Sequence, residues 1–314
     1  MPSLLKPPRL RPGDLIGVVA PASPMKHDRL ENGIRYLENL GYKIKLGKAV
    51  YHEHGYLAGH DRARANDINR MFHDRRVKAI FCIRGGYGTP RLLPLLDYDA
   101  IRANPKIFVG YSDITAIQLA MLRHAGLVTF SGPMVASEMA KSIEPFTEEN
   151  FWRMVTHPEP FGEFARPAAG RYEMISRGRA VGPLIGGCLS LVASLVGSPH
   201  FPDKKESIFF IEEIGEAPYR IDRMLTQLRE AGILKNIGGF VLGQMTDCVP
   251  ADEEPSQTLE DLLRDFIKPL KIPAITGLDY GHVNVKHTLP FGVRAELIAR
   301  GEQSKLRIVE SAVS

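Results

Sequence analysis

The chain has 314 residues, of which 44% are hydrophobic and 24% are charged, the proportions of an ordinary globular protein. Its length allows two domains or one large one. The net charge of +4, from 40 basic and 36 acidic residues, is too small to indicate nucleic acid or an anionic membrane surface as a partner.

Cysteine spacing and hydropathy exclude further classes. The three cysteines are far apart and form no C-x-x-C pair, which argues against disulfides and against a cysteine-based zinc site. There is no run of about 18 apolar residues, so we expect no transmembrane helix. The first residues include prolines where a signal peptide has its apolar core, so we expect no signal peptide and a cytoplasmic location.

Strand and helix signals alternate through the first half of the chain, which predicts a parallel sheet covered by helices on both faces. Short apolar runs predict the strands, and segments of helical length or spacing predict the helices. The predicted strands are residues 14–20, 42–46, 77–83, 107–110 and 127–131, and the predicted helices are residues 27–40, 61–72, one that ends near Leu96 and one that follows Ser112.

The pattern breaks between residues 156 and 178, where prolines accumulate and no apolar period persists. We interpret residues 157–178 as a linker between an N-terminal domain of residues 1–156 and a C-terminal domain of residues 179–314. The C-terminal part is richer in strands. Strands are predicted at residues 180–184, 207–211, 240–242, 274–276, 294–299 and 305–309, and helices at residues 190–196, 219–231 and 258–267.

The first candidate for chemistry is Ser112. A short apolar strand leads into Gly110, the serine stands on the turn, and a strongly apolar helix follows. Several unrelated hydrolases present a nucleophile on such an element, where backbone N–H groups can stabilise an oxyanion. Serine is also a common N-cap residue, so this stretch alone leaves both roles open.

A nucleophilic serine needs a base that takes its proton and an acid that orients the base. His282 follows a predicted strand, and Gly281 beside it permits close approach of the backbone. His287, five residues later, is the rival candidate. Either histidine, taken alone, also fits a hydrogen-bonded loop residue.

The acid is expected among the carboxylates that follow the predicted strand 207–211. Glu212 comes first, and a side chain at the carboxyl end of a strand lies at the edge where α/β sites form. Glu213 and Glu216 are alternatives that could instead pair with Arg220 or Arg223. A plain acidic surface turn fits the same residues equally well.

Glycines dominate the turn from Arg84 to Gly88. Glycines after a strand let backbone N–H groups face a ligand, because no Cβ blocks the approach. The turn lacks both the G-x-G-x-x-G and the G-x-x-x-x-G-K-[ST] spacing, so a phosphate cradle has little support and we expect no cofactor. It is either a tight turn or part of an oxyanion hole, with the N–H of Asp113 as the second donor.

Three histidines in a polar segment raise the question of a metal. His52, His54 and His60 lie close in sequence, but no carboxylate or cysteine at ligand spacing accompanies them. We therefore interpret them as loop residues and expect no metal site.

Motifs spread in order over nearly the whole chain resemble those of the L,D-carboxypeptidase family of serine peptidases, the muramoyl-tetrapeptide carboxypeptidases. Microcin-immunity peptidases are a related branch. The motifs are residues 11–23 (Arg-Pro-Gly-Asp-x-Ile-x-Val-Val-Ala-Pro-Ala-Ser), residues 84–88, residues 110–115, Gly186-Gly187 with the following Leu-Ser-Leu, the strand that ends in Glu212, residues 219–225, and Gly281-His282.

This resemblance implies an α/β fold, with a Rossmann-like parallel sheet in the N-terminal domain and a smaller, barrel-like, β-rich C-terminal domain. It implies a catalytic triad of Ser112, Glu212 and His282, and an oxyanion hole formed by the N–H groups of Gly86 and Asp113. The active site is expected between the domains, in a homodimer without cofactor or metal.

The implied substrate is the cytosolic murein tetrapeptide, whose terminal D-Ala is removed in cell-wall recycling. Arg84 is our candidate for binding the free carboxylate of that residue, although it could pair with an acid instead. The sequence departs from the family at Cys188, where an asparagine is usual, which removes an amide that could hold substrate.

Two alternatives stay open: cleavage of a peptidyl-nucleotide antibiotic, and small-molecule binding without catalysis. The chain lacks the long insertion and extra tryptophan expected of the microcin branch, since its single Trp152 lies near the linker. The resemblance does not distinguish meso-diaminopimelate from lysine in the substrate, nor a linear from a cross-linked peptide.

Overall fold

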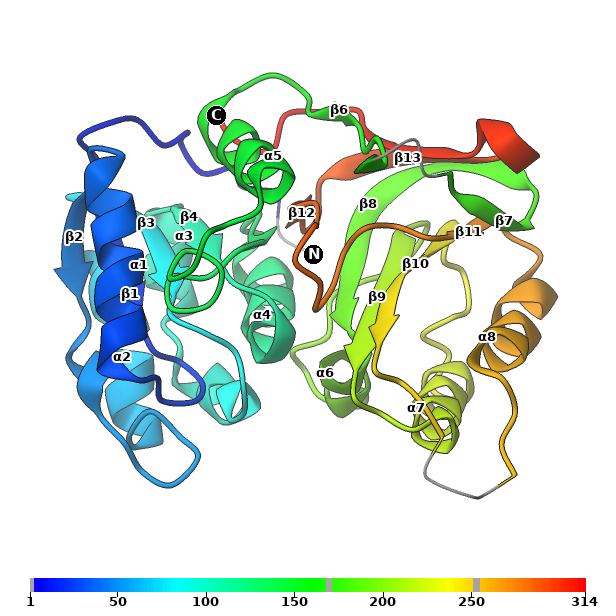
Figure 1. Ribbon diagram of the computed structural model, residues 1–314, viewed down its shortest axis with the longest axis horizontal. Helices are drawn as coiled ribbons and strands as arrows, with labels where there is room; N and C mark the ends of the chain where they lie inside the picture. Colours follow the sequence, from blue (N-terminus) through cyan, green and yellow to red (C-terminus); the bar gives the residue numbers. More distant parts are fainter. Residues whose placement is uncertain (1–2, 168–170, 251–254) are drawn as a thin grey trace.

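Two β-sheets lie side by side and form the frame of the molecule (Figure 1). The computed structural model describes residues 3–167, 171–250 and 255–314. Helices pack on both sheets, so the predicted mixed α/β class is confirmed. Within the described ranges, no helix combines the length and the apolar character needed to cross a membrane.

The first sheet has six strands in the order β12-β5-β4-β3-β1-β2. Five of them come from the first half of the chain and run parallel. This strand order is that of a doubly wound, Rossmann-like sheet, in which ligands bind beyond the carboxyl ends of the strands where the order reverses, here between β1 and β3. The five strands are β1 (Leu15–Val19), β2 (Lys43–Leu46), β3 (Val77–Cys82), β4 (Ile107–Val109) and β5 (Phe130–Ser131).

The helices of this half follow the predicted order with one exception. The helix predicted to end near Leu96 is a 3-10 segment, η2 (Thr89–Leu95), because Pro90 and Pro94 lack the N–H groups that an α-helix needs. The other elements are α1 (His27–Asn39), η1 (Lys48–Tyr51), α2 (Asp61–His73), α3 (Tyr98–Ala103), η3 (Ser112–Ile114), α4 (Thr115–Ala125) and α5 (Pro145–Thr156).

The second sheet has eight strands in the order β6-β14-β13-β8-β9-β10-β11-β7. Its central strands, β8 to β11, run parallel. The sheet curls, since β7 and β11 near one edge contact β13 near the other, which accounts for the barrel-like character. The strands are β6 (Gly162–Glu163), β7 (Glu173–Ser176), β8 (Gly178–Cys188), β9 (Ile208–Ile214), β10 (Gly239–Thr246), β11 (Ala274–Thr276), β13 (Arg294–Ala299) and β14 (Lys305–Ile308).

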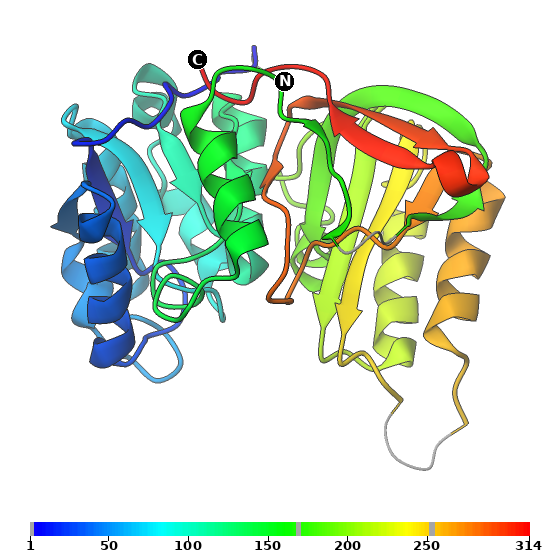
Figure 2. The same ribbon diagram turned by 45° about the horizontal axis from the view of Figure 1, so that its top comes forward.

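Helices α7 and α8 run along one side of this second sheet (Figure 2). The shorter α6 packs between β8 and α7, and it also contacts α4 of the first half. Buried hydrophobic residues of both halves form one continuous core. The helical elements of this half are α6 (Leu189–Ser194), α7 (Pro218–Glu230), α8 (Leu259–Ile267), η5 (Lys268–Leu270) and η6 (Gly301–Gln303).

The two halves exchange short strands. The segment that we interpreted as a linker contains β6 and β7, which both join the second sheet. In the other direction, β12 (Leu289–Pro290) pairs antiparallel with β5 at the edge of the first sheet. Strands of two to four residues are too short to show an apolar period, so the sequence pattern could not reveal them. The domain boundaries at residues 156 and 178 stay a prediction.

Strand β9 also extends further than expected. It continues through Ile214, so Glu212 lies within the strand, in register with Cys188 of β8. The strand was predicted to end at residue 211 because charged residues are rare in buried strands. Strand β9 is an exception to this rule, because the side chains of Glu212 and Glu213 are both buried.

We predict that Gly186→Ala prevents close pairing of β8 with β9. Gly186 has φ +156°, and a Cβ placed there would lie 1.7 Å from the carbonyl oxygen of Phe210. Because that oxygen belongs to the backbone of the neighbouring strand, only a displacement of the strands can relieve the clash. Thermal and urea unfolding should show a loss of about 2 kcal/mol or more.

Gly197→Ala is the matched control. Gly197 also has a positive φ, +81°, but no atom lies within 4 Å of an added Cβ. This variant should lose only the backbone strain, about 1 kcal/mol. Equal losses in the two variants would contradict the clash at Gly186.

Candidate active site

Ser112 stands on a sharp turn between β4 and the helical segment η3–α4. Its φ of 64° lies in the left-handed region, which residues other than glycine rarely adopt, while Tyr111 before it is extended. A strained strand-to-helix turn of this kind exposes a serine hydroxyl at the edge of a sheet. The Ser112 hydroxyl makes no hydrogen bond to any described residue, so it is free to turn toward a substrate.

The glycine-rich turn after β3 packs directly against Ser112. A Cβ added to Gly85 would lie 2.8 Å from the Cβ of Ser112, so only glycine permits this approach. Thr89 joins the two turns, because its N–H donates to Oδ2 of Asp113 over 2.9 Å and its hydroxyl donates to the Asp113 carbonyl. The structure therefore brings Gly86 and Asp113, the two predicted oxyanion donors, to the serine turn.

Asp113 itself is buried, and burial raises the pKa of its carboxyl group to about 6, against the opposing effect of the Thr89 N–H. Its side chain serves as the acceptor that holds the two turns together. The N–H of Asp113 is the atom that the oxyanion role requires, and the side-chain contact leaves it available.

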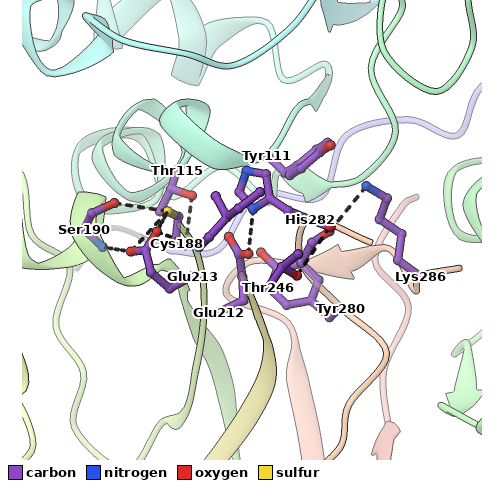
Figure 3. A network of polar contacts seen from close by, with 12 residues as sticks. Tyr111, Thr115, Cys188, Ser190, Glu212, Glu213, Thr246, Tyr280, His282 and Lys286 are labelled. Atoms are coloured by element: carbon purple, nitrogen blue, oxygen red, sulfur yellow. Dashed lines mark hydrogen bonds and ion pairs between the residues drawn. The ribbon is translucent and has the colours of Figure 1, made fainter. Parts of the chain in front are cut away.

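His282 and Glu212 form a hydrogen-bonded pair (Figure 3). Nδ1 of the imidazole lies 2.8 Å from Oε2 of Glu212, and the two side chains are 15% and 1% exposed. A carboxylate that accepts from Nδ1–H leaves Nε2 free as the proton acceptor and stabilises the imidazolium that forms. Oε1 of Glu212 has no hydrogen-bond partner among the described residues, so His282 is the polar contact of this carboxylate.

The loop that carries His282 is fixed on both sides. It connects β11 of the second sheet to β12 of the first. Its Tyr280 hydroxyl is hydrogen-bonded to Oγ of Ser131 over 2.8 Å, and its carbonyl accepts from the N–H of Gln244 over 2.9 Å. The Thr246 hydroxyl donates to the carbonyl oxygen of His282 over 3.4 Å. The imidazole is thus held between the two sheets.

A cavity of about 620 Å³ lies between the two halves at this point. Ser112, His282, Gly86 and Asp113 all line it, and Glu212 lies behind His282, out of contact with solvent. The structure thus brings the three predicted triad residues and both oxyanion donors to one place.

Arg84 also lines the cavity. Its guanidinium donates to the carbonyl oxygens of Gly85, over 3.1 Å, and Pro24, over 3.4 Å. It makes no ion pair with a carboxylate in the described part of the chain. The structural pairing that we considered for Arg84 is therefore not observed, and its charge faces the cavity.

The rival base, His287, lies elsewhere. It is buried, its Nε2 is 3.0 Å from the carbonyl oxygen of Ala165, and the rings of Phe146 and Phe164 pack on it. Burial lowers its pKa to about 4. This histidine belongs to the aromatic core and does not line the cavity.

The rival acids line the cavity but do not contact His282. Glu213 accepts from the N–H groups of Ser190, over 2.7 Å, and Ile214, over 2.8 Å, and Sγ of Cys188 faces it at 3.6 Å. Burial raises the pKa of the Glu213 carboxyl group. Glu216 lies 3.4 Å from Arg220, which is the structural pairing that we considered for it.

The histidine segment and Trp152, which the sequence also raised as candidates, lie outside the cavity. The rings of His54 and His60 contact each other, with centroids 4.4 Å apart, and among the described residues no group of three or more His, Cys, Asp and Glu could hold a metal ion. Trp152 stacks on Tyr42 and donates to the hydroxyl of Tyr36, so it is part of the core and not of the cavity.

Sequence reasoning missed a group of residues behind the site: Tyr111, Glu138 and Lys286. The Tyr111 ring contacts the His282 ring edge-on, with centroids 5.2 Å apart. Glu138 and Lys286 form an ion pair of 2.6 Å beside it. Only the position of Tyr111 next to Ser112 could have suggested it, and no spacing pattern marks the other two.

Comparison with known proteins gives two family matches, one in each half of the chain. Residues 16–132 match the LD-carboxypeptidase N-terminal domain, and residues 181–297 match the LD-carboxypeptidase C-terminal domain. The chain belongs to the LD-carboxypeptidase family.

Relatives of this family cover nearly the whole chain. The chain is 40% identical over 311 residues to a probable murein peptide carboxypeptidase of Bacillus subtilis, covering 98% of this chain and 95% of the relative. It is 29% identical to the microcin C7 self-immunity protein MccF of Escherichia coli, covering 90% of each. The crystal structure of muramoyltetrapeptide carboxypeptidase from Oxalobacter formigenes is similar with a TM-score of 0.83 and 34% identity, over 94% of this chain and 98% of that one.

The left-handed backbone at Ser112 leads to a prediction about the stability of this member of the family. Ser112→Gly should raise the free energy of unfolding relative to Ser112→Ala by about 1 kcal/mol, because glycine adopts a φ of 64° without a steric penalty. Both variants lack the hydroxyl, so chemical unfolding of the two isolates the backbone term. An alanine variant as stable as the glycine variant would show that the turn is not strained.

Proposed function

We propose that the chain is a serine-type L,D-carboxypeptidase that releases the terminal D-Ala from murein tetrapeptides during cell-wall recycling. The family and its peptidase chemistry stand on the matches above. The observation that supports the serine mechanism is the pairing of His282, which lines the same cavity as Ser112, with the buried Glu212. A histidine held by a buried carboxylate beside a strained serine is the arrangement that acyl transfer requires.

The first half of the reaction forms an acyl-enzyme. Oγ of Ser112 attacks the carbonyl carbon between the L-centre of the diamino acid and D-Ala, while Nε2 of His282 takes the hydroxyl proton. Glu212 holds the imidazole through Nδ1 and stabilises its charged form. The N–H groups of Gly86 and Asp113 donate to the oxyanion, and loss of one such donor costs about 3 kcal/mol in the barrier.

The second half releases the products. His282 gives its proton to the amine of D-Ala, which leaves as the scissile bond breaks. Water then takes the place of the amine, loses a proton to His282 and attacks the ester carbonyl. His282 returns the proton to Oγ of Ser112 as the ester bond breaks, which releases the tripeptide and restores the enzyme. In this scheme Arg84 binds the free carboxylate of the D-residue. This role suits a half-buried guanidinium that, among the described residues, is bonded to backbone carbonyls alone.

Removal of each triad member tests the mechanism. With purified protein and murein tetrapeptide, Ser112→Ala should lower kcat about 10⁶-fold, because a triad acts as a unit. Glu212→Gln should lower it about 10⁴-fold, since a neutral amide no longer stabilises the imidazolium. Mass spectrometry of the tripeptide and D-Ala products is the measurement.

Matched variants in the same cavity are the controls. Ser137 and Glu213 also line it, so Ser137→Ala and Glu213→Gln report on general disturbance of the cavity. If Ser112→Ala keeps activity, the assignment of Ser112 as the nucleophile is wrong. If Glu213→Gln inactivates the enzyme and Glu212→Gln does not, the assignment of Glu212 as the acid is wrong.

The similarity to MccF supports a second candidate, cleavage of a peptidyl-nucleotide antibiotic by the same triad. The aromatic residues that line the cavity are Tyr87 and Tyr111. The ring of Tyr111 is buried, which leaves Tyr87 for stacking on a base. This lining favours the murein peptide, and parallel assays with both substrates distinguish the two activities.

A fluorophosphonate probe distinguishes a non-catalytic binding protein from either enzyme, because the probe labels an activated serine and does not react with the serine of a binding protein.

We also propose that the protein is a cytoplasmic homodimer. Size-exclusion chromatography with light scattering tests the dimer.

A further inference from the structure

A buried ion pair lies beside the proposed active site and has no part in the mechanism above. Nζ of Lys286 is 2.6 Å from Oε1 of Glu138, and the side chains are only 3% and 13% exposed. Burial alone would raise the pKa of the Glu138 carboxyl group, but the Lys286 ammonium holds that pKa below its ordinary value. Glu138 is therefore held as a carboxylate in this buried place.

Tyr111 connects this pair to the serine turn. Its hydroxyl donates to the same oxygen of Glu138 over 2.7 Å, and the Lys286 ammonium lies 3.9 Å from the centre of its ring, a cation–π contact. The residue that follows Tyr111 is Ser112. The position of the tyrosine thus bears directly on that of the serine.

The same lysine also contacts the loop of the histidine. Nζ of Lys286 donates to the carbonyl oxygen of Gly281, the residue before His282, over 3.3 Å. The other end of this loop is held by Thr147, whose hydroxyl donates to the carbonyl of Asn284 and accepts from the N–H of Lys286. One ammonium group therefore joins the neighbour of Ser112 to the neighbour of His282.

Stability alone does not explain a buried ion pair at this place. Removing two charges from water costs several kcal/mol each, and apolar residues of similar volume often serve as well or better. A charged pair with fixed geometry does orient its contacts, and here the contacts lie on segments that belong to different sheets. Tyr111 follows β4 of the first sheet, and Lys286 lies on the connection that leaves β11 of the second.

We propose that Glu138 and Lys286 are positioning residues that hold the turn of Ser112 and the loop of His282 in the alignment needed for proton transfer. Tyr111 is the side chain through which they act on both. This inference rests on the proposed roles of Ser112 and His282.

Other charged or titratable groups also face His282 and contribute to its environment. Glu212 bonds to it from β9. Arg29, Arg84, Asp113, Glu213 and Glu216 line the cavity that His282 shares with Ser112. Lys141 and Glu144 line a second cavity, of about 420 Å³, that His282 and Arg29 also line. The ion pair differs from these groups because it contacts both Tyr111, the neighbour of Ser112, and Gly281, the neighbour of His282.

The test uses Glu138→Gln and Lys286→Met in the full-length enzyme with murein tetrapeptide. Each should lower kcat about 10²-fold with KM changed less than about threefold, since the substrate contacts stay and only the alignment is lost. Lys286→Arg keeps the charge, so its kcat should be at least about tenfold higher than that of Lys286→Met. Equal activity of wild type and both variants would overturn the proposal.

The pH profile gives a readout that a merely structural role would not move. In Glu138→Gln the Lys286 charge is no longer balanced, so it disfavours the imidazolium of His282. The acid limb of kcat/KM should therefore shift to lower pH, by about half a unit or more. A profile that coincides with that of the wild type would contradict the proposal.

Glu296→Gln is the matched control for loss of a buried ion pair. Glu296 is 2% exposed and lies between Arg179 and Arg307 on the second sheet, and it lines neither cavity. The Glu296→Gln variant should have a lower melting temperature but the kcat and pH profile of the wild type. If Glu296→Gln changes kcat and the pH profile as Glu138→Gln does, the effect is general destabilisation and the proposal fails.

The double variant Glu138→Gln, Lys286→Met covers the case in which a single variant does not fold. It removes both charges together, so it should fold, keep the wild-type acid limb and still show the loss in kcat. Full kcat in the double variant would overturn the proposal. If the wild type neither cleaves tetrapeptide nor reacts with a fluorophosphonate, the proposed function fails instead, so the two failures are distinguishable.

Discussion

The connection between β11 and β12 is the constraint on which the site depends. It leaves the second sheet, carries Tyr280, His282 and Lys286, and ends as a strand of the first sheet. Because the serine turn belongs to the first sheet and Glu212 to the second, only a segment that touches both can place an imidazole between them. The hydrogen bonds of Tyr280 to Ser131 and of His282 to Glu212 anchor this segment at each side.

Burial determines the electrostatics around that segment. Glu212 is fully buried and its polar contact is His282, so the energy of the carboxylate depends on the histidine. Its neighbour Glu213 has other partners, since it accepts from the N–H of Ser190 in the first turn of α6 and from the N–H of Ile214 on β9. Two adjacent acids on one strand therefore have separate tasks, as alternation of side chains across a sheet requires. The same alternation turns Glu212 toward the loop of His282.

Much of the architecture could be predicted from the sequence. Elements with a clear period or a clear end were found nearly to the residue, as α1, α2, β11 and β13 illustrate. The misses have physical reasons. The prolines of η2 replaced an α-helix with a 3-10 segment, and β6, β7 and β12 are too short to show a pattern.

The site was predictable only in part. Ser112 could be proposed from a strand–turn–helix pattern, because local geometry fixes its exposure. His282 and Glu212 could be ranked by their place at strand ends, but spacing could not exclude His287 or Glu213. The structure distinguishes them by contact, since His287 lies in an aromatic core. Glu138 is far from Ser112 and from Lys286 in sequence, so the cluster that it forms follows from the tertiary fold alone.

A crystal structure of the fluorophosphonate adduct tests the central claim most directly. The account predicts phosphorus bonded to Oγ of Ser112, the phosphonyl oxygen within about 3 Å of the N–H groups of Gly86 and Asp113, and Nε2 of His282 within hydrogen-bond reach of the serine oxygen. An adduct on another residue, or one with its phosphonyl oxygen directed to solvent and His282 turned away, would contradict it.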